Sequence, residues 1–177
     1  LSNDSDLNGD TLTITAIAGR PLTPRVAQSI PVLTGTVNIS AVGIITFTPS
    51  PDYNGPVSFD YTISDGRGGI ATATVNGTVT PVNDAPAGSV TIVGTTSQGQ
   101  VLTASNNLSD ADGIPSGAIT YQWKANGTAI SGATGDRYTL TQAEVGKSIT
   151  VTASYTDNQG TSEAVTSAAT DVVADVN

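Results

Sequence analysis

The sequence contains no cysteine, no histidine and no methionine. The chain therefore cannot form disulfides, and it offers no thiol nucleophile, no imidazole base and none of the soft or nitrogen ligands of zinc, copper or haem sites. It also lacks a signal peptide and any apolar run approaching about 18 residues, so we expect no membrane insertion. A fold built from these residues must be stabilised by packing or by a bound group.

Positive charge is scarce. There are 6 Lys and Arg residues against 15 acidic ones, which gives a net charge of −9. Nucleic acid and anionic membranes would be repelled by this charge, and neither is expected as a partner. Nearly all the acids are Asp, because only Glu144 and Glu163 are Glu. Asp is disfavoured in strands, favours turns, and has a short carboxylate that suits hard cations.

The 177 residues leave room for two domains of about 90 residues each. Apolar and polar residues alternate with the period of β-strands along most of the chain. The alternating runs are 12–16, 45–47, 57–63 and 71–75 in the first half and 90–92, 102–104, 119–123, 138–140 and 149–155 in the second. We predict an all-β chain of two tandem Greek-key β-sandwiches, residues 1–84 and 85–177, joined at the proline-bracketed segment 81–86.

Turn residues separate the strands. Asn126-Gly127 predicts a hairpin, and residues 142–145 indicate one helical turn. The turn Asp52-Tyr53-Asn54-Gly55 could touch a ligand, but a capped hairpin is favoured. Residues 20–35 form the candidate irregular loop. Trp123 alternates with apolar neighbours, which favours a buried core position over a sugar-stacking surface.

Each half carries an acidic loop and a later hairpin loop, residues 3–10 and 64–68 in the first half and 109–113 and 156–160 in the second. The second half has two strands before its acidic loop, over residues 89–106, whereas the first half starts inside its acidic loop. We therefore expect the first domain to be N-terminally incomplete. It should be less ordered than the second domain, or completed by strand complementation or a dimer.

The first half resembles the bacterial cadherin-like repeat, through residues 3–15, 43–55, 58–69 and the exit 81–86. The second half resembles the bacterial immunoglobulin-like repeat, through residues 108–113, 119–127, 130–134, 140–160 and 174–177. Such modules occur in tandem in large secreted adhesins of the repeats-in-toxin type, in Gram-negative biofilm formers. The resemblance implies a calcium-dependent, extended protein at the bacterial cell surface, whose partners are neighbouring modules of the same polypeptide.

The acidic loops predict calcium sites. Residues 4–10 have oxygens at alternate positions and a glycine at the bend, like the front half of an EF-hand loop, but Thr15 stands at the twelfth position, which excludes a true EF-hand. The hairpin loop at the same end could supply the missing carboxylate. The predicted ligands in the first domain are Asn3, Asp4, Asp6, Asn8, Asp10 and Asp65.

In a sandwich of immunoglobulin type, the two corresponding loops of the second domain face the incoming linker. Four carboxylates brought together there would repel one another unless a divalent cation bound. The predicted ligands at this joint are Asn83, Asp84, Asp110, Asp112 and Asp157. The alternative is that these residues only make good turns.

No feature of the sequence places two carboxylates across a cleft, so we expect no enzyme. The favoured function is a calcium-rigidified spacer of an adhesin, in cell adhesion or biofilm formation. The alternative is a binding module that recognises a glycan or a peptide at the adhesin tip. An exposed aromatic cluster or a long irregular loop would favour that alternative.

Overall fold

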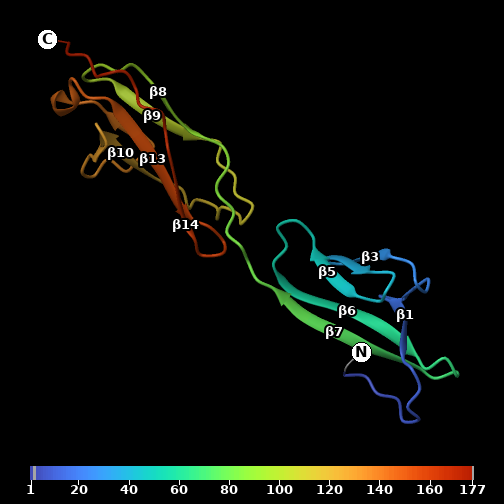
Figure 1. Cartoon of the computed structure of the whole chain (residues 1–177). Helices are drawn as coiled ribbons and strands as arrows, with labels where there is room; N and C mark the ends of the chain where they lie inside the picture. The colour runs from blue at the N-terminus through green and yellow to red at the C-terminus, as the bar shows by residue number, and fades with distance from the viewer. Residues whose placement is uncertain (2, 177) are drawn as a thin grey trace. The chain divides into compact units, whose positions relative to one another are not determined.

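The computed structural model describes residues 1 and 3–176 and divides into two compact units, Leu1–Val82 (unit 1) and Asn83–Asn177 (unit 2). This boundary lies two residues before the one drawn from the sequence. Among the described residues the regular elements are strands and one short 3-10 helix, which confirms the all-β fold (Figure 1). No helix among them is long and apolar enough to span a bilayer. Asn177, the last residue of the predicted 174–177 segment, lies outside the described part.

Unit 1 consists of two antiparallel sheets. The four-stranded sheet has the order β2-β1-β6-β7, with β2 at Arg20–Pro21, β1 at Thr13–Ile17, β6 at Gly55–Ser64 and β7 at Ile70–Val79. The three-stranded sheet has the order β3-β4-β5, with β3 at Gln28–Val32, β4 at Gly35–Ile39 and β5 at Ile45–Pro49. The buried core between them is small and consists of Ile17, Ile30, Val37, Tyr61 and Ile63.

The prediction that residues 20–35 form an irregular loop is wrong, because β2 and β3 lie there. Pro31 lies inside β3, where its missing N–H would break a central ladder. The strand tolerates it because β3 is at the edge of its sheet and pairs only with β4. Ile30 points into the core and is 7 % exposed.

The alternation expected in β1 is interrupted. A bulge between Ile14 and Ala16 shifts the register with β6, so that Ile17 rather than Ala16 is the fully buried residue. Two residues of β1 there face one of β6, and side chains beyond the bulge change sides. The hairpin expected at residues 52–55 is also wrong. This turn leads from β5 in one sheet to β6 in the other, and the Tyr53 hydroxyl donates to the Pro56 carbonyl.

Unit 2 has the same four-stranded arrangement in a fuller sandwich. Its larger sheet has the order β11-β10-β13-β14, with β11 at Thr128–Ala129, β10 at Thr120–Ala125, β13 at Ile149–Thr156 and β14 at Ser162–Thr166. Its smaller sheet has the order β12-β9-β8, with β12 at Arg137–Thr139, β9 at Val101–Asn106 and β8 at Val90–Val93. The chain crosses between sheets after β9, β11 and β12, as in Greek-key sandwiches.

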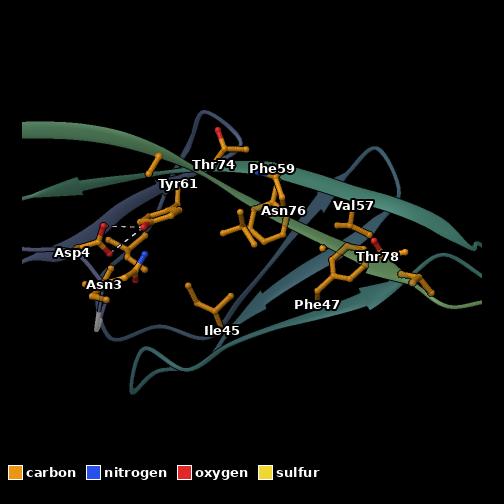
Figure 2. Close-up of a pocket in the computed structure, with 16 residues that line it drawn as sticks. Asn3, Asp4, Ile45, Phe47, Val57, Phe59, Tyr61, Thr74, Asn76 and Thr78 are labelled. Carbon is orange, nitrogen blue, oxygen red and sulfur yellow. Dashed lines mark hydrogen bonds between the residues drawn. The ribbon is translucent and has the colours of Figure 1, made fainter.

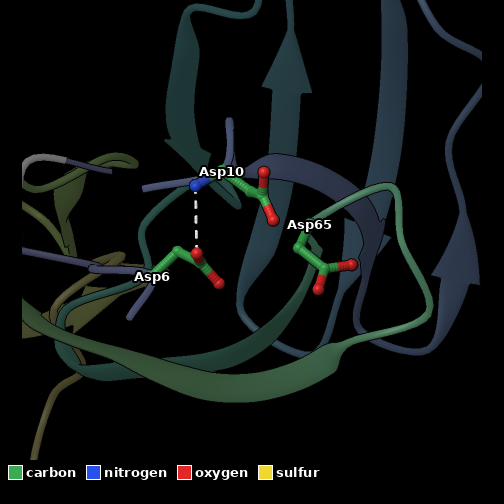
Figure 3. A group of neighbouring side chains, drawn as sticks. All are labelled: Asp6, Asp10 and Asp65. Atoms are coloured by element: carbon green, nitrogen blue, oxygen red, sulfur yellow. Dashed lines mark hydrogen bonds between the residues drawn. The ribbon is translucent and has the colours of Figure 1, made fainter. Parts of the chain in front are cut away.

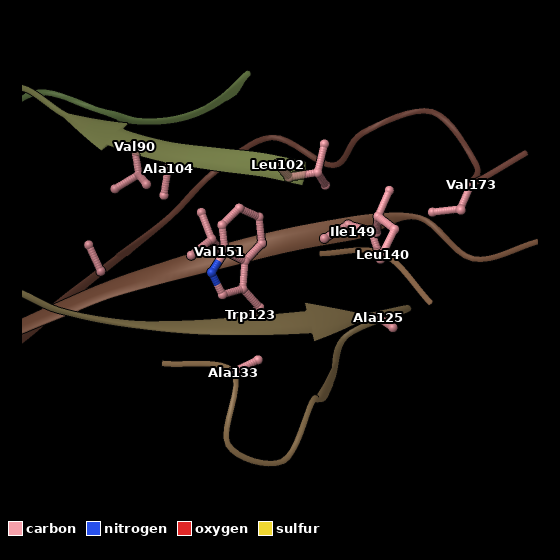
Figure 4. Packing of buried hydrophobic residues seen from close by; sticks show 11 residues of the cluster. Val90, Leu102, Ala104, Trp123, Ala125, Ala133, Leu140, Ile149, Val151 and Val173 are labelled. Atoms are coloured by element: carbon pink, nitrogen blue, oxygen red, sulfur yellow. The ribbon is translucent and has the colours of Figure 1, made fainter. Parts of the chain in front are cut away.

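Trp123 is the centre of the unit 2 core, as the sequence predicts (Figure 4). Its side chain is 0 % exposed, and its indole N–H donates to the Gly135 carbonyl at 2.8 Å. The ring lies 6.0 Å from that of Tyr138. Buried indoles usually find a partner for the N–H in this way. A surface that stacks sugars on Trp123 is therefore absent from the described fold.

Two local predictions in unit 2 are confirmed. Asn126 and Gly127 both have positive φ, 48° and 80°, and connect β10 to β11 in the two-residue hairpin that this pair favours. The helical turn is the 3-10 helix Gln142–Glu144. It begins with a capping box, in which Thr141 N–H donates to the Glu144 carboxylate at 2.9 Å.

Candidate metal centre

Three aspartates meet at one end of unit 1 (Figure 3). Asp6 and Asp10 come from the acidic loop before β1, and Asp65 comes from the loop that joins β6 to β7. One carboxylate oxygen of each lies within 4.8 Å of the others, and all three residues are partly buried. Since β1 pairs with β6, the loop before β1 and the loop after β6 must lie at the same end of the sheet. The predicted approach of these two loops is thus present.

The loops hold these aspartates through backbone hydrogen bonds. Oδ1 of Asp6 accepts from the N–H groups of Asn8 at 2.8 Å and Asp10 at 2.9 Å. Oδ1 of Asp65 accepts from Arg67 at 2.7 Å and Gly69 at 2.9 Å in the same manner. These Asx turns fix the backbone with one oxygen of each side chain. The second oxygens of Asp6 and Asp65 take no part in these turns.

The cluster carries three negative charges against one nearby cation. Arg67 Nε lies 3.0 Å from Asp10 Oδ1, but the arginine side chain is 76 % exposed. An exposed ion pair contributes little to stability and does not neutralise three carboxylates. Carboxylate oxygens at such spacing suit Ca²⁺, which accepts six to eight oxygens in variable geometry.

The other predicted ligands of unit 1, Asn3, Asp4 and Asn8, lie outside the three-aspartate cluster. Both oxygens of Asp4 accept the Tyr61 hydroxyl proton, at 2.9 and 3.0 Å. That hydrogen bond, with burial and the charge of Asp4, raises the pKa of Tyr61 above its usual value. Asn3 and Asp4 line an apolar groove rather than the aspartate cluster. Asn8 is exposed, and its described contact is the backbone bond to Asp6.

In unit 2, residues of the acidic loop and of β14 form hydrogen bonds with the first two residues of the unit. The Asp84 N–H donates to Asp112 Oδ2 at 2.7 Å, and the Asn83 amide donates to Glu163 Oε1 at 2.9 Å. The other oxygen of Asp112 accepts from the Gln159 side chain. Asp112 is 8 % exposed. The segment that enters unit 2 is thus held by the loops that the sequence predicts, through hydrogen bonds.

Asp110 lies beside this network. Its Oδ1 accepts from the Asp112 N–H at 2.9 Å, and its Oδ2 accepts the Tyr155 hydroxyl at 2.5 Å. Burial, and then the hydrogen bond and charge of Asp110, raise the pKa of Tyr155 well above its usual range. Each unit therefore pairs a loop aspartate with a tyrosine from the third strand of its larger sheet.

Asp157 in unit 2 is a buried carboxylate with one oxygen that accepts no hydrogen bond in the described part of the chain. It is 4 % exposed, and its Oδ1 accepts from the N–H groups of Gln159 and Thr161, both at 2.8 Å. Its Oδ2 is buried and accepts no hydrogen bond from the described residues. A buried, unsatisfied carboxylate oxygen is costly, and a bound cation is one way to compensate for it.

The four carboxylates predicted at this joint do not form a compact group. Among the described residues, only the cluster in unit 1 brings three acidic side chains within 4.8 Å. Both oxygens of Asp112 already accept from protein donors. Hydrogen bonds place Asp84 and Asp110 beside Asp112, and the Ca²⁺ site expected from Asp84, Asp110, Asp112 and Asp157 stays a prediction.

Sequence reasoning missed four residues of these ends: Arg67, Tyr155, Gln159 and Glu163. Glu163 lies directly opposite Tyr155 in the β13–β14 ladder, so the register of that hairpin could have indicated it. Gly113 also belongs here. Its φ is +85°, which favours glycine, and a Cβ on it would meet the end of the Asn158 side chain in the neighbouring loop.

Residues 1–78 match the family model of the bacterial Ig domain, which is 78 of the 177 residues. No curated protein and no solved structure matches the chain. The match lies on the half that resembles cadherin-like repeats by sequence, and that finer resemblance remains a prediction. Bacterial Ig-like domains are typically non-enzymatic structural modules, often in adhesins. Residues 1–78 are thus similar to bacterial immunoglobulin-like domains, a class usually found outside the cell or at its surface.

Proposed function

We propose that this chain is a spacer segment of a large secreted bacterial adhesin of the repeats-in-toxin type, stiffened by Ca²⁺. The observation that carries the proposal is the cluster of Asp6, Asp10 and Asp65 on two adjoining loops. At 4.8 Å, two unit charges in water repel by about 0.9 kcal/mol. A bound Ca²⁺ replaces this repulsion with attraction and joins the acidic loop to the β6–β7 loop.

A second Ca²⁺ site is proposed at the start of unit 2. Its support is the buried, unpartnered Oδ2 of Asp157 and the adjacent network through Asp112 and Asp84. An ion there would anchor the residues that enter unit 2 and so restrict the connection from unit 1. A chain of such modules would hold a distant adhesive tip away from the cell and contribute to adhesion and biofilm formation.

Calorimetric titration of the full chain with Ca²⁺ tests this proposal. We expect saturable binding that Asp10→Asn weakens and that Asp60→Asn leaves unchanged. Asp60 is an exposed aspartate on β6 that accepts from Thr74, so its variant removes the same charge away from the cluster. Asp157→Asn, compared with the exposed Asp136→Asn, addresses the second site in the same way. Absence of binding, or equal binding by each variant and its control, would contradict the proposal.

Small-angle scattering of the same chain tests the stiffening. With Ca²⁺ in excess, we expect a narrower distribution of overall dimensions than with a chelator. Curves that superimpose in the two conditions would refute the stiffening, even if calorimetry detects a bound ion.

A further inference from the structure

One side of the unit 1 sandwich is an open apolar groove of about 640 Å³ (Figure 2). Its walls come mainly from β5, β6 and β7, and Ile14 of β1 and the N-terminal residues Leu1, Asn3 and Asp4 also line it. Phe47 on β5 and Phe59 on β6 stack with ring centroids 6.2 Å apart, and neither is fully buried. Val75 on β7 is 39 % exposed. Groups of apolar side chains of this kind belong to a core rather than to a solvated surface.

Unit 2 shows what covers the corresponding side. Its larger sheet, β11-β10-β13-β14, has the same order as β2-β1-β6-β7. Over the corresponding face lies the ribbon of β8 and β9, which adds to the edge of β12. Leu102 and Ala104 of β9 and Val90 of β8 point into the core and are 0 %, 5 % and 4 % exposed (Figure 4).

In unit 1 the place of that ribbon is empty among the described residues. β5 corresponds to β12, because each is the strand from which the chain crosses into the third strand of the larger sheet. β5 pairs with β4 on one side, and its other edge pairs with no described strand. A free strand edge beside an apolar groove is a template for another strand.

The groove has room for large side chains. The residues of β7 that share the inner face with Val57 and Tyr61 are Gly77 and Ala73. A Cβ on Gly77 would meet nothing within 4 Å. Asp4 is the only charged side chain in the lining, and the Tyr61 hydroxyl holds its carboxylate at one end. An occupant therefore places large, uncharged side chains into the groove.

We propose that unit 1 binds an extended polypeptide segment from outside residues 1–177, which adds to the free edge of β5 and inserts an apolar side chain at every second residue. The pattern of this segment is that of β9, with larger side chains over Gly77 and Ala73. A second copy of this chain is a poor occupant because residues 1–82 carry six Asp and three Arg, and the whole chain has a net charge of −9. The proposal does not depend on Ca²⁺.

A synthetic peptide of residues 89–106, which carries β8 and β9, serves as the probe. It is titrated into the isotope-labelled full chain and followed by amide chemical shifts. We expect saturable shifts and slower amide exchange in β5 and β7, since new main-chain bonds form along β5. The matched control peptide carries Leu102→Asp and Ala104→Asp, and we expect it not to bind because it would bury two charges.

Two variants of β7 locate the site. Val75→Lys places a charge in the groove and should weaken peptide binding by about tenfold or more. Thr72→Lys changes the opposite face of the same strand, where the Thr72 hydroxyl contacts that of Thr62, and should change binding by no more than about twofold. Spectra of both variants without peptide show whether unit 1 keeps its fold.

Each of four other outcomes would overturn the proposal. The first is equal binding of the two peptides, and the second is equal effects of the two variants. The third is chemical-shift changes confined to unit 2, which would mean that the peptide replaces β8 and β9 of the chain itself. The fourth is a concentration-dependent dimer in sedimentation that Val75→Lys abolishes, because a second copy would then occupy the groove.

Discussion

Replacing Asp65 by Asn should change the stability of unit 1 in opposite directions with and without Ca²⁺. The substitution keeps an oxygen at the position that accepts from the Arg67 and Gly69 N–H groups, so the loop is retained. It removes one of three charges whose oxygens lie within 4.8 Å. The two like-charge interactions lost amount to about 0.9 kcal/mol each in water, and physiological salt roughly halves them.

In a chelator, Asp65→Asn is therefore expected to stabilise unit 1 by about 1 kcal/mol. In Ca²⁺ at about 100 times the dissociation constant, the unsubstituted chain gains about 2.7 kcal/mol from one site. If the variant no longer binds, it should then be less stable than the unsubstituted chain by roughly 1.5–2 kcal/mol. For a domain of this size, each kcal/mol shifts the melting temperature by about 4–8 °C.

Differential scanning calorimetry of the full chain is the appropriate assay. Trp123 lies in unit 2, so its fluorescence during the same heating identifies the unit 2 transition. Asp60→Asn is the control and should not reverse sign between the two conditions. An effect of Asp65→Asn with the same sign in chelator and in Ca²⁺ would refute the account of this cluster.

Further variants test other parts of the account. Arg67→Ala should lower the free energy of unfolding of unit 1 by less than about 1 kcal/mol in chelator, since its ion pair with Asp10 is exposed. The same change should raise the Ca²⁺ affinity measured by calorimetry, because a competing cation is lost. A lower affinity would show that Arg67 supports the site. Gly113→Ala should destabilise unit 2 in urea more than Gly117→Ala. Both glycines have positive φ, 85° and 74°, so the backbone strain is similar, but a Cβ at Gly113 would also contact Asn158. Equal losses of stability would mean that this loop contact is unimportant. Trp123→Ala should cost about 3–5 kcal/mol in the unit 2 transition, and a silent substitution would contradict its central place in the core.

The strands of unit 2 follow from the sequence because several local signals agree. Apolar residues alternate through residues 149–155, and Asn126-Gly127 allows the two positive φ values of a tight hairpin. Trp123 is predictable for the same reason, because an isolated large aromatic in an alternating run belongs on the inner face. In these segments the local pattern and the tertiary structure favour the same conformation.

The strands of unit 1 that were missed depend on their neighbours. The bulge in β1 is a property of its register with β6, which alternation along one strand does not contain. Pro31 argues against a strand unless that strand lies at an edge, and edge position is set by the whole sheet. The turn at residues 52–55 has hairpin composition, yet the strands that it joins lie in different sheets.

The candidate site divides in the same way. Asp65 could be placed beside the acidic loop because both loops lie at the same end of any sandwich of this type. The roles of Gln159 and Glu163 could not be predicted, because they depend on which side chains donate and accept hydrogen bonds once the β13–β14 hairpin has formed. Composition indicates carboxylates at the unit 2 loops, but it does not indicate that hydrogen bonds occupy both oxygens of Asp112.

Thermal unfolding of the full chain in Ca²⁺, in Mg²⁺ and in chelator tests the central claim most directly. Ca²⁺ tolerates irregular oxygen geometry, whereas Mg²⁺ requires near-octahedral ligands and loses water reluctantly. We predict a higher melting temperature of unit 1 in Ca²⁺ than in chelator, with a much smaller increase in Mg²⁺. Identical melting curves in Ca²⁺ and in chelator would contradict the claim that this chain is stiffened by calcium.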